Sequence, residues 1–163
     1  MRTLLSGGVK SGKSSRALVI ARAFPEPRYF LATAEPFDGE MRERIARHQA
    51  DRAGGFITIE EPLDIQEKLV ENMVLDCVTL WINNLFHYGR EARIDDEVES
   101  LIAKLPRNIV IVTNEVGQGF VPADSLSRRY GEALGRTNAR LAAACDEVVL
   151  MVAGLPLTLK SPR

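Results

Sequence analysis

A glycine-rich segment near the start of the chain has the composition of a phosphate-binding loop. Residues 7–14 read GGVKSGKS and match the pattern G-x-x-x-x-G-K-[ST] throughout. In such a loop the glycines let backbone N–H groups turn toward an anion, and the following helix adds its positive N-terminal end. Lys13 would reach the β- and γ-phosphates, and the Ser14 hydroxyl would bind Mg²⁺. The segment predicts a nucleoside triphosphate site made of Gly7, Gly8, Val9, Lys10, Ser11, Gly12, Lys13 and Ser14.

An aspartate further along the chain could complete this site. Asp76 follows three apolar residues in the stretch MVLDC, an arrangement typical of the acid that holds Mg²⁺ in proteins with a phosphate-binding loop. The same aspartate could instead cap a helix that begins near Thr79. We favour the metal role and predict Ser14 and Asp76 as the protein groups that hold Mg²⁺.

A histidine among arginines forms another candidate site. His48 lies in RERIARHQADR, residues 42–52, and helical spacing puts it on the same face as Ile45, with Arg44 and Arg52 beside it. Nearby cations disfavour a second positive charge, so the imidazole would tend to be neutral and nucleophilic. The residues alone leave three interpretations open. They are a core histidine with a solvated arginine face, an arginine lid over the phosphates, and a nucleophile that carries a nucleotide as a phosphoramidate.

The elements that must position these residues alternate between strand and helix. Short apolar runs predict strands at 2–7, 28–34, 56–60, 73–78, 147–152 and at the start of 108–116. Longer amphipathic runs predict helices at about 12–23, 38–52, 63–70, 80–89, 95–105 and 125–144. This alternation predicts an α/β fold of the P-loop NTPase type, a three-layer sandwich whose mostly parallel central sheet has helices on both faces. We expect residues 1–163 to form a single nucleotide-binding domain.

Composition excludes several classes of protein. The chain has 163 residues, 45% of them hydrophobic, and a formal net charge of −1, so nothing overall points to a nucleic acid or membrane partner. No apolar run approaches the roughly 20 residues of a membrane span, and the N-terminus does not read as a signal peptide. Cys77 and Cys145 fit neither a metal motif nor a disulfide framework. We therefore expect a cytoplasmic protein with small-molecule partners.

An ordered set of segments resembles one protein family. The chain is similar nearly end to end to the bifunctional adenosylcobinamide kinase/adenosylcobinamide-phosphate guanylyltransferases of cobalamin biosynthesis. The segments that carry the resemblance are GGVKSGKS, YFLATA, DGEMRERIARHQADR, ITIEEP, LDCVTLWINNL, VTNEVGQGFVP and GRTNARLAAACDEVVLMVAGLP. The resemblance implies phosphorylation of adenosylcobinamide with ATP or GTP. It also implies transfer of GMP from GTP to adenosylcobinamide phosphate, which yields adenosylcobinamide-GDP and pyrophosphate.

The resemblance assigns roles to particular residues. It implies that His48 carries the guanylyl group, and with Lys13 and Asp76 this histidine makes up the predicted catalytic set. It further implies a guanine nucleotide site that includes Ala32, Thr33, Ala34, Gln49, Ala50, Asp51, Arg52, Glu60 and Ile82. A carboxylate such as Glu60 can accept hydrogen bonds from guanine N1–H and the exocyclic amine, although a solvated acid at a strand end is the simpler interpretation. The resemblance also implies that the protein is a homotrimer.

Other polar residues keep two interpretations. Asn114 and Glu115 follow a predicted strand and could serve the corrinoid or the metal, or form hydrogen bonds that cap the loop. Arg136 could meet phosphate or a neighbouring subunit, or be a surface arginine. His87 lies near a predicted helix end, where a contact with the helix dipole explains a histidine without a catalytic role. The motifs alone also allow a second function, that of a P-loop small-molecule kinase without guanylyltransferase activity.

Overall fold

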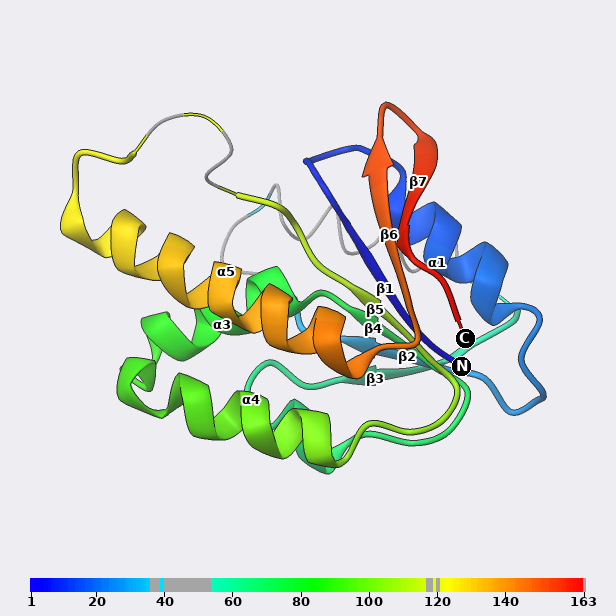
Figure 1. Ribbon diagram of the computed structural model, residues 1–163. Coiled ribbons are helices and arrows are strands. Elements are labelled where there is room, and N and C mark those ends of the chain that lie inside the picture. The colour runs from blue at the N-terminus through cyan, green and yellow to red at the C-terminus, as the bar shows by residue number, and fades with distance from the viewer. Residues whose placement is uncertain (36–38, 40–53, 117–118, 120, 163) are drawn as a thin grey trace.

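Seven strands form one sheet through the middle of the molecule (Figure 1). The computed structural model describes residues 1–35, 39, 54–116, 119 and 121–162. The strands are β1 (Arg2–Gly7), β2 (Tyr29–Ala32), β3 (Ile57–Glu60), β4 (Met73–Asp76), β5 (Ile109–Val112), β6 (Glu147–Val152) and β7 (Leu155–Lys160). Their order is β3-β2-β4-β5-β1-β6-β7, and every pair is parallel except β6 with β7. The prediction of a mostly parallel sheet is confirmed.

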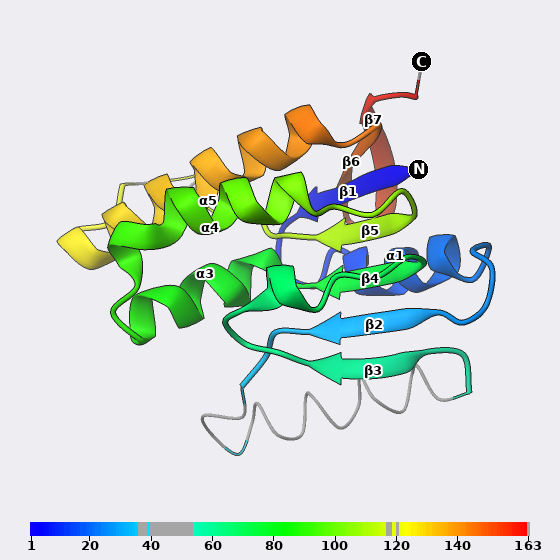
Figure 2. The ribbon, with the colours of Figure 1, turned by 90° about the horizontal axis from the view of Figure 1, so that it is seen from below.

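Helices cover both faces of this sheet (Figure 2). Helix α1 (Lys13–Ala21) packs on one face, and α3 (Val78–His87), α4 (Ile94–Ala103) and α5 (Ser125–Ala144) pack on the other. Successive residues of a strand point to opposite faces. In β1, Leu5 belongs to the core cluster around α1, whereas Leu4 belongs to the cluster of the other three helices. Both clusters are buried, which explains why β5 and the first three residues of β4 are apolar on both faces. The three-layer sandwich is confirmed.

One predicted helix is wrong. Residues 63–70 form only the 3-10 turn η1 (Ile65–Glu67), and a second such turn, η2 (Glu91–Arg93), precedes α4. The Leu63 carbonyl accepts a hydrogen bond from Trp81 Nε1 at 2.7 Å, so it is taken up by α3 instead of a helical turn. Buried Gln66 likewise donates to buried Glu97 of α4 at 2.8 Å. Tertiary contacts therefore override the weak helical spacing of this segment.

Strand β7 was not predicted from the sequence. It pairs antiparallel with β6 across a two-residue turn, in which Ala153 and Gly154 have φ of 50° and 83°. Positive φ at both positions is the geometry of a tight hairpin turn that suits the twist of the strands. Pro156 argues against a strand in the sequence, because proline is tolerated in sheets mainly at edge strands. β7 is such an edge strand.

The end of β7 is fastened to the end of α5. Lys160 Nζ donates to the carbonyl oxygens of Ala142 and Ala143, both at 3.1 Å, and to that of Cys145. The last carbonyls of a helix have no partner within the helix and carry the negative end of its dipole. The lysine therefore satisfies both the hydrogen-bonding and the electrostatic need of this helix end.

No helix among the described residues is long and apolar enough to cross a membrane.

We expect Lys160→Met to lower the free energy of unfolding by about 1 kcal/mol, because it removes the hydrogen bonds and the charge at the end of α5. Urea denaturation followed by circular dichroism measures the change. Lys68→Met is the matched control, since Lys68 is exposed and makes no side-chain hydrogen bond within the described residues. Equal losses in the two variants would contradict the role given to Lys160.

Candidate nucleotide-binding site

The predicted phosphate-binding loop joins β1 to α1. Strand β1 ends at Gly7, and α1 begins at Lys13 after the N-cap residue Gly12. No side chain among the described residues caps this helix. The first N–H groups of α1 therefore lack a side-chain acceptor, and together with the positive end of the helix dipole they suit an anion.

The shape of this loop requires glycine at two positions. A Cβ atom at Gly7 would lie 2.3 Å from the Met151 carbonyl oxygen of β6 and 2.9 Å from Ser11 Oγ. Gly12 has φ of 92°, a conformation that residues with a side chain rarely adopt. The loop can therefore turn beside β6 only because these positions carry no side chain.

The lysine and serine of the loop lie at the start of α1. Lys13 is buried, and its Nζ donates to the Gly8 carbonyl oxygen at 2.5 Å and to Ser11 Oγ at 3.3 Å. Ser14 is half-buried in the first turn of the helix. The ammonium group is thus held against the loop itself, within the segment that is predicted to bind phosphate.

The other predicted polar groups follow strands of the same edge. The sheet register aligns Glu60, Ala32 and Asp76, at the ends of β3, β2 and β4, with Val112 of β5 and Leu5 of β1. In open α/β sheets, ligands bind at this carboxyl edge. Neighbouring strands lie about 4.8 Å apart, so Asp76 is roughly 10 Å and Glu60 roughly 19 Å from β1. Figure 2 shows these strands in order along the sheet.

The segment after β2 is locked to the strand end that carries Asp76. Thr33 is fully buried, and its hydroxyl donates to the Cys77 carbonyl oxygen at 2.8 Å and accepts from Cys77 N–H at 2.9 Å. Its backbone N–H donates to the Asp76 carbonyl oxygen at 3.1 Å. Residues 32–34 are consequently fixed next to Asp76, on the side of β4 that faces away from the phosphate-binding loop.

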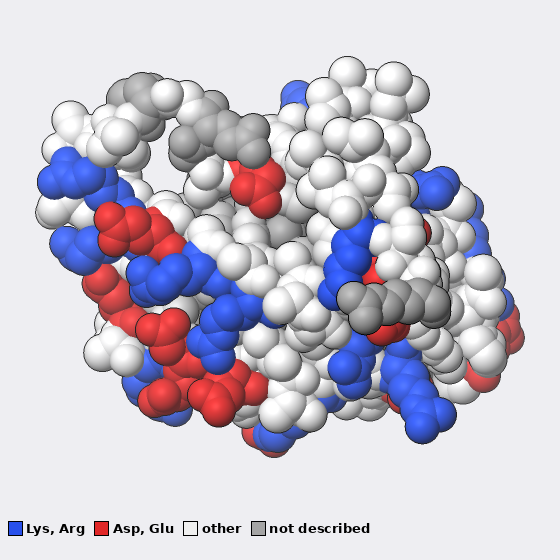
Figure 3. Space-filling model, in the orientation of Figure 1, with Lys and Arg blue, Asp and Glu red and all other residues white. Residues whose placement is uncertain are grey.

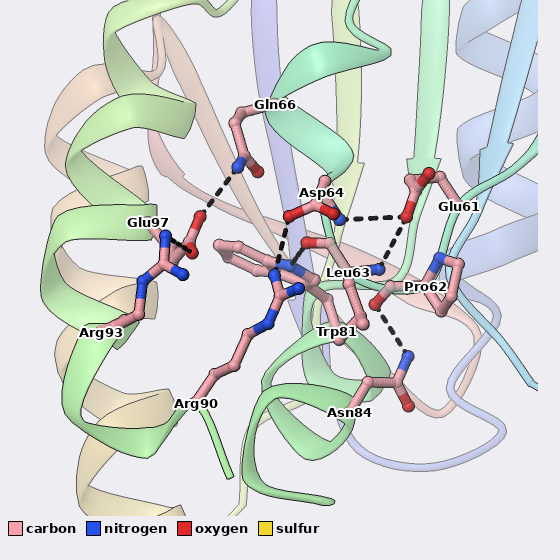
Figure 4. Close-up of polar contacts among 10 residues, drawn as sticks. All are labelled: Glu61, Pro62, Leu63, Asp64, Gln66, Trp81, Asn84, Arg90, Arg93 and Glu97. Carbon is pink, nitrogen blue, oxygen red and sulfur yellow. Dashed lines mark hydrogen bonds and ion pairs between the residues drawn. The ribbon is translucent and has the colours of Figure 1, made fainter. Parts of the chain in front are cut away.

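Asn84 joins the loops that follow β2 and β3. This residue of α3 is 1% exposed, and its Nδ2 donates to the Thr33 carbonyl oxygen at 2.8 Å and to that of Pro62 at 3.0 Å. Figure 4 shows Asn84 pointing from α3 toward Pro62. Sequence reasoning missed this residue. The signal was a polar residue on the apolar stripe of a helix, since Trp81 and Leu85, its neighbours in this stripe, are both fully buried.

The loop that begins with Glu60 has further anchors (Figure 4). Glu61 Oε1 accepts from the N–H groups of Leu63 and Asp64, both at 3.0 Å. Arg90 donates to Asp64 at 2.7 Å, and this ion pair raises the pKa of Arg90. Glu60 itself is exposed at the strand end. Its carboxylate is therefore carried by a backbone that is firmly held on both sides.

The loop after β5 approaches the phosphate-binding loop. Glu115 N–H donates to the Gly7 carbonyl oxygen at 3.2 Å, and Ser6 Oγ donates to Glu115 Oε1 at 2.6 Å. Asn114 N–H donates to Thr79 Oγ1 at 2.7 Å, and Asn138 Nδ2 donates to the Asn114 carbonyl oxygen at 3.0 Å. The hydrogen bonds that cap this loop are thus present, and they bring Glu115 beside the first residue of the predicted triphosphate site.

Two tyrosines beside these loops act as hydrogen-bond donors. Tyr130 OH donates to the Thr79 carbonyl oxygen at 3.1 Å, and burial raises the pKa of Tyr130 to about 12. Tyr88 OH donates to Glu35 Oε1 at 3.1 Å, and this hydrogen bond raises the pKa of Tyr88. Both phenols stay protonated at neutral pH, so they serve as ties between elements and not as acid–base groups.

Several predicted residues fall elsewhere. Ile82 is fully buried in the hydrophobic core, so the structure does not support its side chain as a nucleotide contact, and its spacing on the apolar face of α3 explains it as a packing residue. His87 is exposed at the last position of α3, as its helix-end interpretation expects. The residues outside the described part of the chain are His48, Gln49, Ala50, Asp51 and Arg52.

Charged residues of both signs alternate over α4 and α5 (Figure 3). Arg129 pairs with Glu91 at 2.7 Å, and Arg140 pairs with Asp95 at 3.5 Å. Arg136 is exposed and lies 4.0 Å from the same aspartate. Its interpretation as a surface arginine therefore fits its surroundings, and this face is not the basic stripe that a nucleic acid would need.

Comparisons with known proteins give a consistent result. The family described as "Cobinamide kinase / cobinamide phosphate guanyltransferase" matches residues 3–159. A "Bifunctional adenosylcobalamin biosynthesis protein CobP" of Pseudomonas aeruginosa is 40% identical over 169 residues, which cover 98% of each chain. A "Bifunctional adenosylcobalamin biosynthesis protein CobU" of Salmonella typhimurium is 35% identical over 182 residues, which cover 98% of this chain and all of the relative.

One solved structure resembles this chain in its fold but not in its sequence. It is that of a prototypical ATPase from the type III secretion system of pathogenic bacteria, with a TM-score of 0.52 and 11% sequence identity. The match covers 93% of this chain but 52% of the ATPase, so the chain spans about half the length of that protein. The likeness agrees with the P-loop NTPase type of α/β fold that the sequence predicts.

We expect Asn84→Asp to lower the free energy of unfolding by about 2 kcal/mol or more. The change removes both donated hydrogen bonds and places a carboxylate against two carbonyl oxygens in a buried position. Urea denaturation followed by fluorescence measures this loss. Trp81, the single tryptophan, donates to Leu63 of the same loop and reports on it directly.

Asn83→Asp is the matched control, because Asn83 is exposed on the adjacent position of α3. It should change the free energy of unfolding by less than about 0.5 kcal/mol. If the two variants were equally stable, Asn84 would not hold the loops together.

Proposed function

The chain belongs to the cobinamide kinase/cobinamide phosphate guanyltransferase family, and we propose that it catalyses both reactions on the adenosylated substrate. In the first, ATP or GTP phosphorylates the hydroxyl of the aminopropanol arm of adenosylcobinamide. In the second, GMP passes from GTP to adenosylcobinamide phosphate, which gives adenosylcobinamide-GDP and pyrophosphate. The observation that carries the proposal is the family match over residues 3–159, which includes an intact phosphate-binding loop at the carboxyl edge of a parallel sheet.

The phosphate-binding loop would hold the triphosphate in the kinase reaction. The uncapped N-terminus of α1 and the ammonium group of Lys13 offer positive charge to the phosphates. The donor set for Mg²⁺ is the Ser14 hydroxyl and the Asp76 carboxylate. One carboxylate and one hydroxyl suit an ion that keeps several waters and arrives with the nucleotide. When bound, Mg²⁺ would neutralise charge on the phosphoryl oxygens.

His48 would carry the nucleotide in the second reaction. Its neutral imidazole nitrogen attacks the α-phosphorus of GTP, an N–P bond forms, and the bond from that phosphorus to the bridging oxygen breaks as pyrophosphate leaves. A phosphate oxygen of adenosylcobinamide phosphate then attacks the same phosphorus and releases the histidine. Arg44 and Arg52 are our first choices for neutralising the phosphate oxygens, because the spacing predicted from the sequence for a helix would put them on the face of His48.

A second group of residues would recognise guanine. It comprises residues 32–34, Glu60 and residues 49–52. The Glu60 carboxylate is exposed and can accept from N1–H and the exocyclic amine. The hydrogen bonds of Thr33 and Asn84 support the assignment, because they hold the backbone of two of these segments in place. Ile82 is fully buried, so we leave it out of this proposed group.

We further propose that the protein is a homotrimer that works in the cytoplasm as a single domain. Leu155, Leu157 and Leu159 lie on one face of β7 and are each more than half exposed, as is Val152 of β6. An apolar patch of this kind supports a subunit contact. Cys77 and Cys145 are buried and form no disulfide bond, which suits a reducing compartment. Burial also raises the pKa of Cys145 to about 12. One continuous sheet supports the single domain.

Incubation with [α-³²P]GTP and Mg²⁺ should label the protein through an acid-labile, base-stable phosphoramidate, and His48→Ala should abolish the label. His87→Ala is the matched control, because the chain has only two histidines and His87 is exposed. Removal of Mg²⁺ by a chelator should prevent labelling. An unlabelled wild-type protein that still phosphorylated adenosylcobinamide would instead favour the alternative of a P-loop small-molecule kinase.

Light scattering after size-exclusion chromatography should give a mass of three times the 18.1 kDa of one chain. Leu157→Lys should dissociate the assembly by placing a charge in the proposed subunit contact. Thr158→Lys is the control, because the adjacent residue of a strand points to the opposite face. A monomeric wild-type chain would contradict the trimer, and equal dissociation by both variants would contradict the proposed contact face.

A further inference from the structure

Glu115 lies directly beside the first residue of the phosphate-binding loop. The chain continues along β1 after β5 ends, since Thr113 N–H donates to the Leu5 carbonyl oxygen at 2.9 Å and Glu115 N–H to that of Gly7 at 3.2 Å. Strand β5 separates β1 from β4. The glutamate therefore follows a strand that lies between the loop and the strand end that carries Asp76.

Hydrogen bonds from two buried side chains fix one oxygen of this carboxylate. Glu115 Oε1 accepts from Ser6 Oγ at 2.6 Å and from Asn138 Nδ2 at 3.3 Å. Ser6 is 4% exposed and Asn138 is 7% exposed. Among the described residues, no hydrogen bond is made to Oε2. The carboxylate is thus held by one oxygen, and the other is left for a ligand.

A wider polar network holds these donors in turn. Asn138 Oδ1 accepts from Thr113 Oγ1 at 2.7 Å, while its Nδ2 also donates to the Asn114 carbonyl oxygen at 3.0 Å. Thr113 is fully buried, and Thr79 Oγ1 accepts from Asn114 N–H at 2.7 Å. Buried polar networks are rigid when every group has a partner. Three elements, α3, α5 and the end of β5, therefore cooperate to orient Glu115.

Capping of the loop does not by itself explain a glutamate here. Ser6 and Asn138 both donate to the same oxygen, so the amide oxygen of a glutamine would accept both bonds equally well. Both donors are neutral, and within the described residues no ion pair compensates the charge. A carboxylate differs from the amide by having a second oxygen that can accept a proton.

We propose that Glu115 is the general base of the kinase reaction, an inference that rests on the proposed function. Oε2 accepts the proton of the substrate hydroxyl as the hydroxyl oxygen attacks the γ-phosphorus. A bond forms between this oxygen and the γ-phosphorus, and the bond from the phosphorus to the β–γ bridging oxygen breaks. The electron pair leaves with the nucleoside diphosphate. The guanylylation of His48 needs no such base, because its nucleophile is a neutral imidazole.

The test is Glu115→Gln, which keeps the acceptor for Ser6 and Asn138 and removes only the proton acceptor. With adenosylcobinamide, [γ-³²P]ATP and Mg²⁺, we expect kcat of the kinase reaction to fall about 100-fold or more, with little change in the KM for ATP. Labelling of the same preparation by [α-³²P]GTP, without corrinoid, should fall far less. Glu99→Gln, which changes an exposed residue of α4, is the matched control and should alter neither rate.

A second variant supplies a positive readout. Glu115→Ala leaves a space beside Ser6, and added formate should restore part of the lost kinase turnover, whereas it should not help Glu115→Gln, in which the amide fills that space. Full kinase activity of Glu115→Gln, or failure of formate to act on a folded Glu115→Ala protein, would overturn the proposal.

Two further outcomes separate this inference from its neighbours. An equal fall of kinase turnover and GTP labelling in Glu115→Gln would assign Glu115 to metal or triphosphate binding and overturn its role as a base. Absence of kinase activity in the unaltered chain would overturn the proposed function and this inference with it, whereas an active Glu115→Gln protein would overturn the inference alone.

Discussion

Parallel pairing of six strands is the constraint on which the other features depend. Because β3, β2, β4, β5, β1 and β6 run in one direction, their carboxyl ends meet at one edge, and each following loop begins there. Loops at such an edge are held only if their backbone groups find partners. Here buried polar side chains provide them: Thr33, Thr79, Asn84 and Asn138. The protein therefore buries polar side chains at the places where they hold a loop.

The same edge carries both of the proposed sites. The phosphate-binding loop follows β1, whereas Glu60 follows β3, roughly 19 Å away at the usual spacing of strands. The segment that contains His48 connects β2 to β3 in the sequence, so the proposed nucleophile lies in sequence between two strands whose ends belong to the proposed guanine site. Asp76 lies between the two ends. This spread is consistent with one domain that supports two transfers with different reacting phosphorus atoms.

Sequence reasoning succeeded where a local pattern is decisive. The loop of residues 7–14 was found because only glycine fits beside Met151 and at the φ of Gly12. Helix 125–144 and strand 147–152 were predicted with the bounds that the structure has, since each has an uninterrupted period. Sequence reasoning failed where contacts between residues far apart in the sequence determine the structure. Nothing local shows that the Leu63 carbonyl binds Trp81 or that Asn84 reaches two loops.

Comparison of two glutamates shows why burial alone does not identify a reactive group. Glu97 is 4% exposed, and its two oxygens are occupied, one by Gln66 Nε2 at 2.8 Å and the other by Arg93 at 3.0 Å (Figure 4). Its charge is compensated by a cation one helical turn away, and its other oxygen accepts the hydrogen bond that joins η1 to α4. Within the described part of the chain, Glu115 has neutral donors on one oxygen only, and its backbone N–H bonds to Gly7 of the phosphate-binding loop. The two glutamates therefore differ in the charge of their partners and in their place in the fold. Glu115 follows β5, which the sheet order places beside β1 and its phosphate-binding loop.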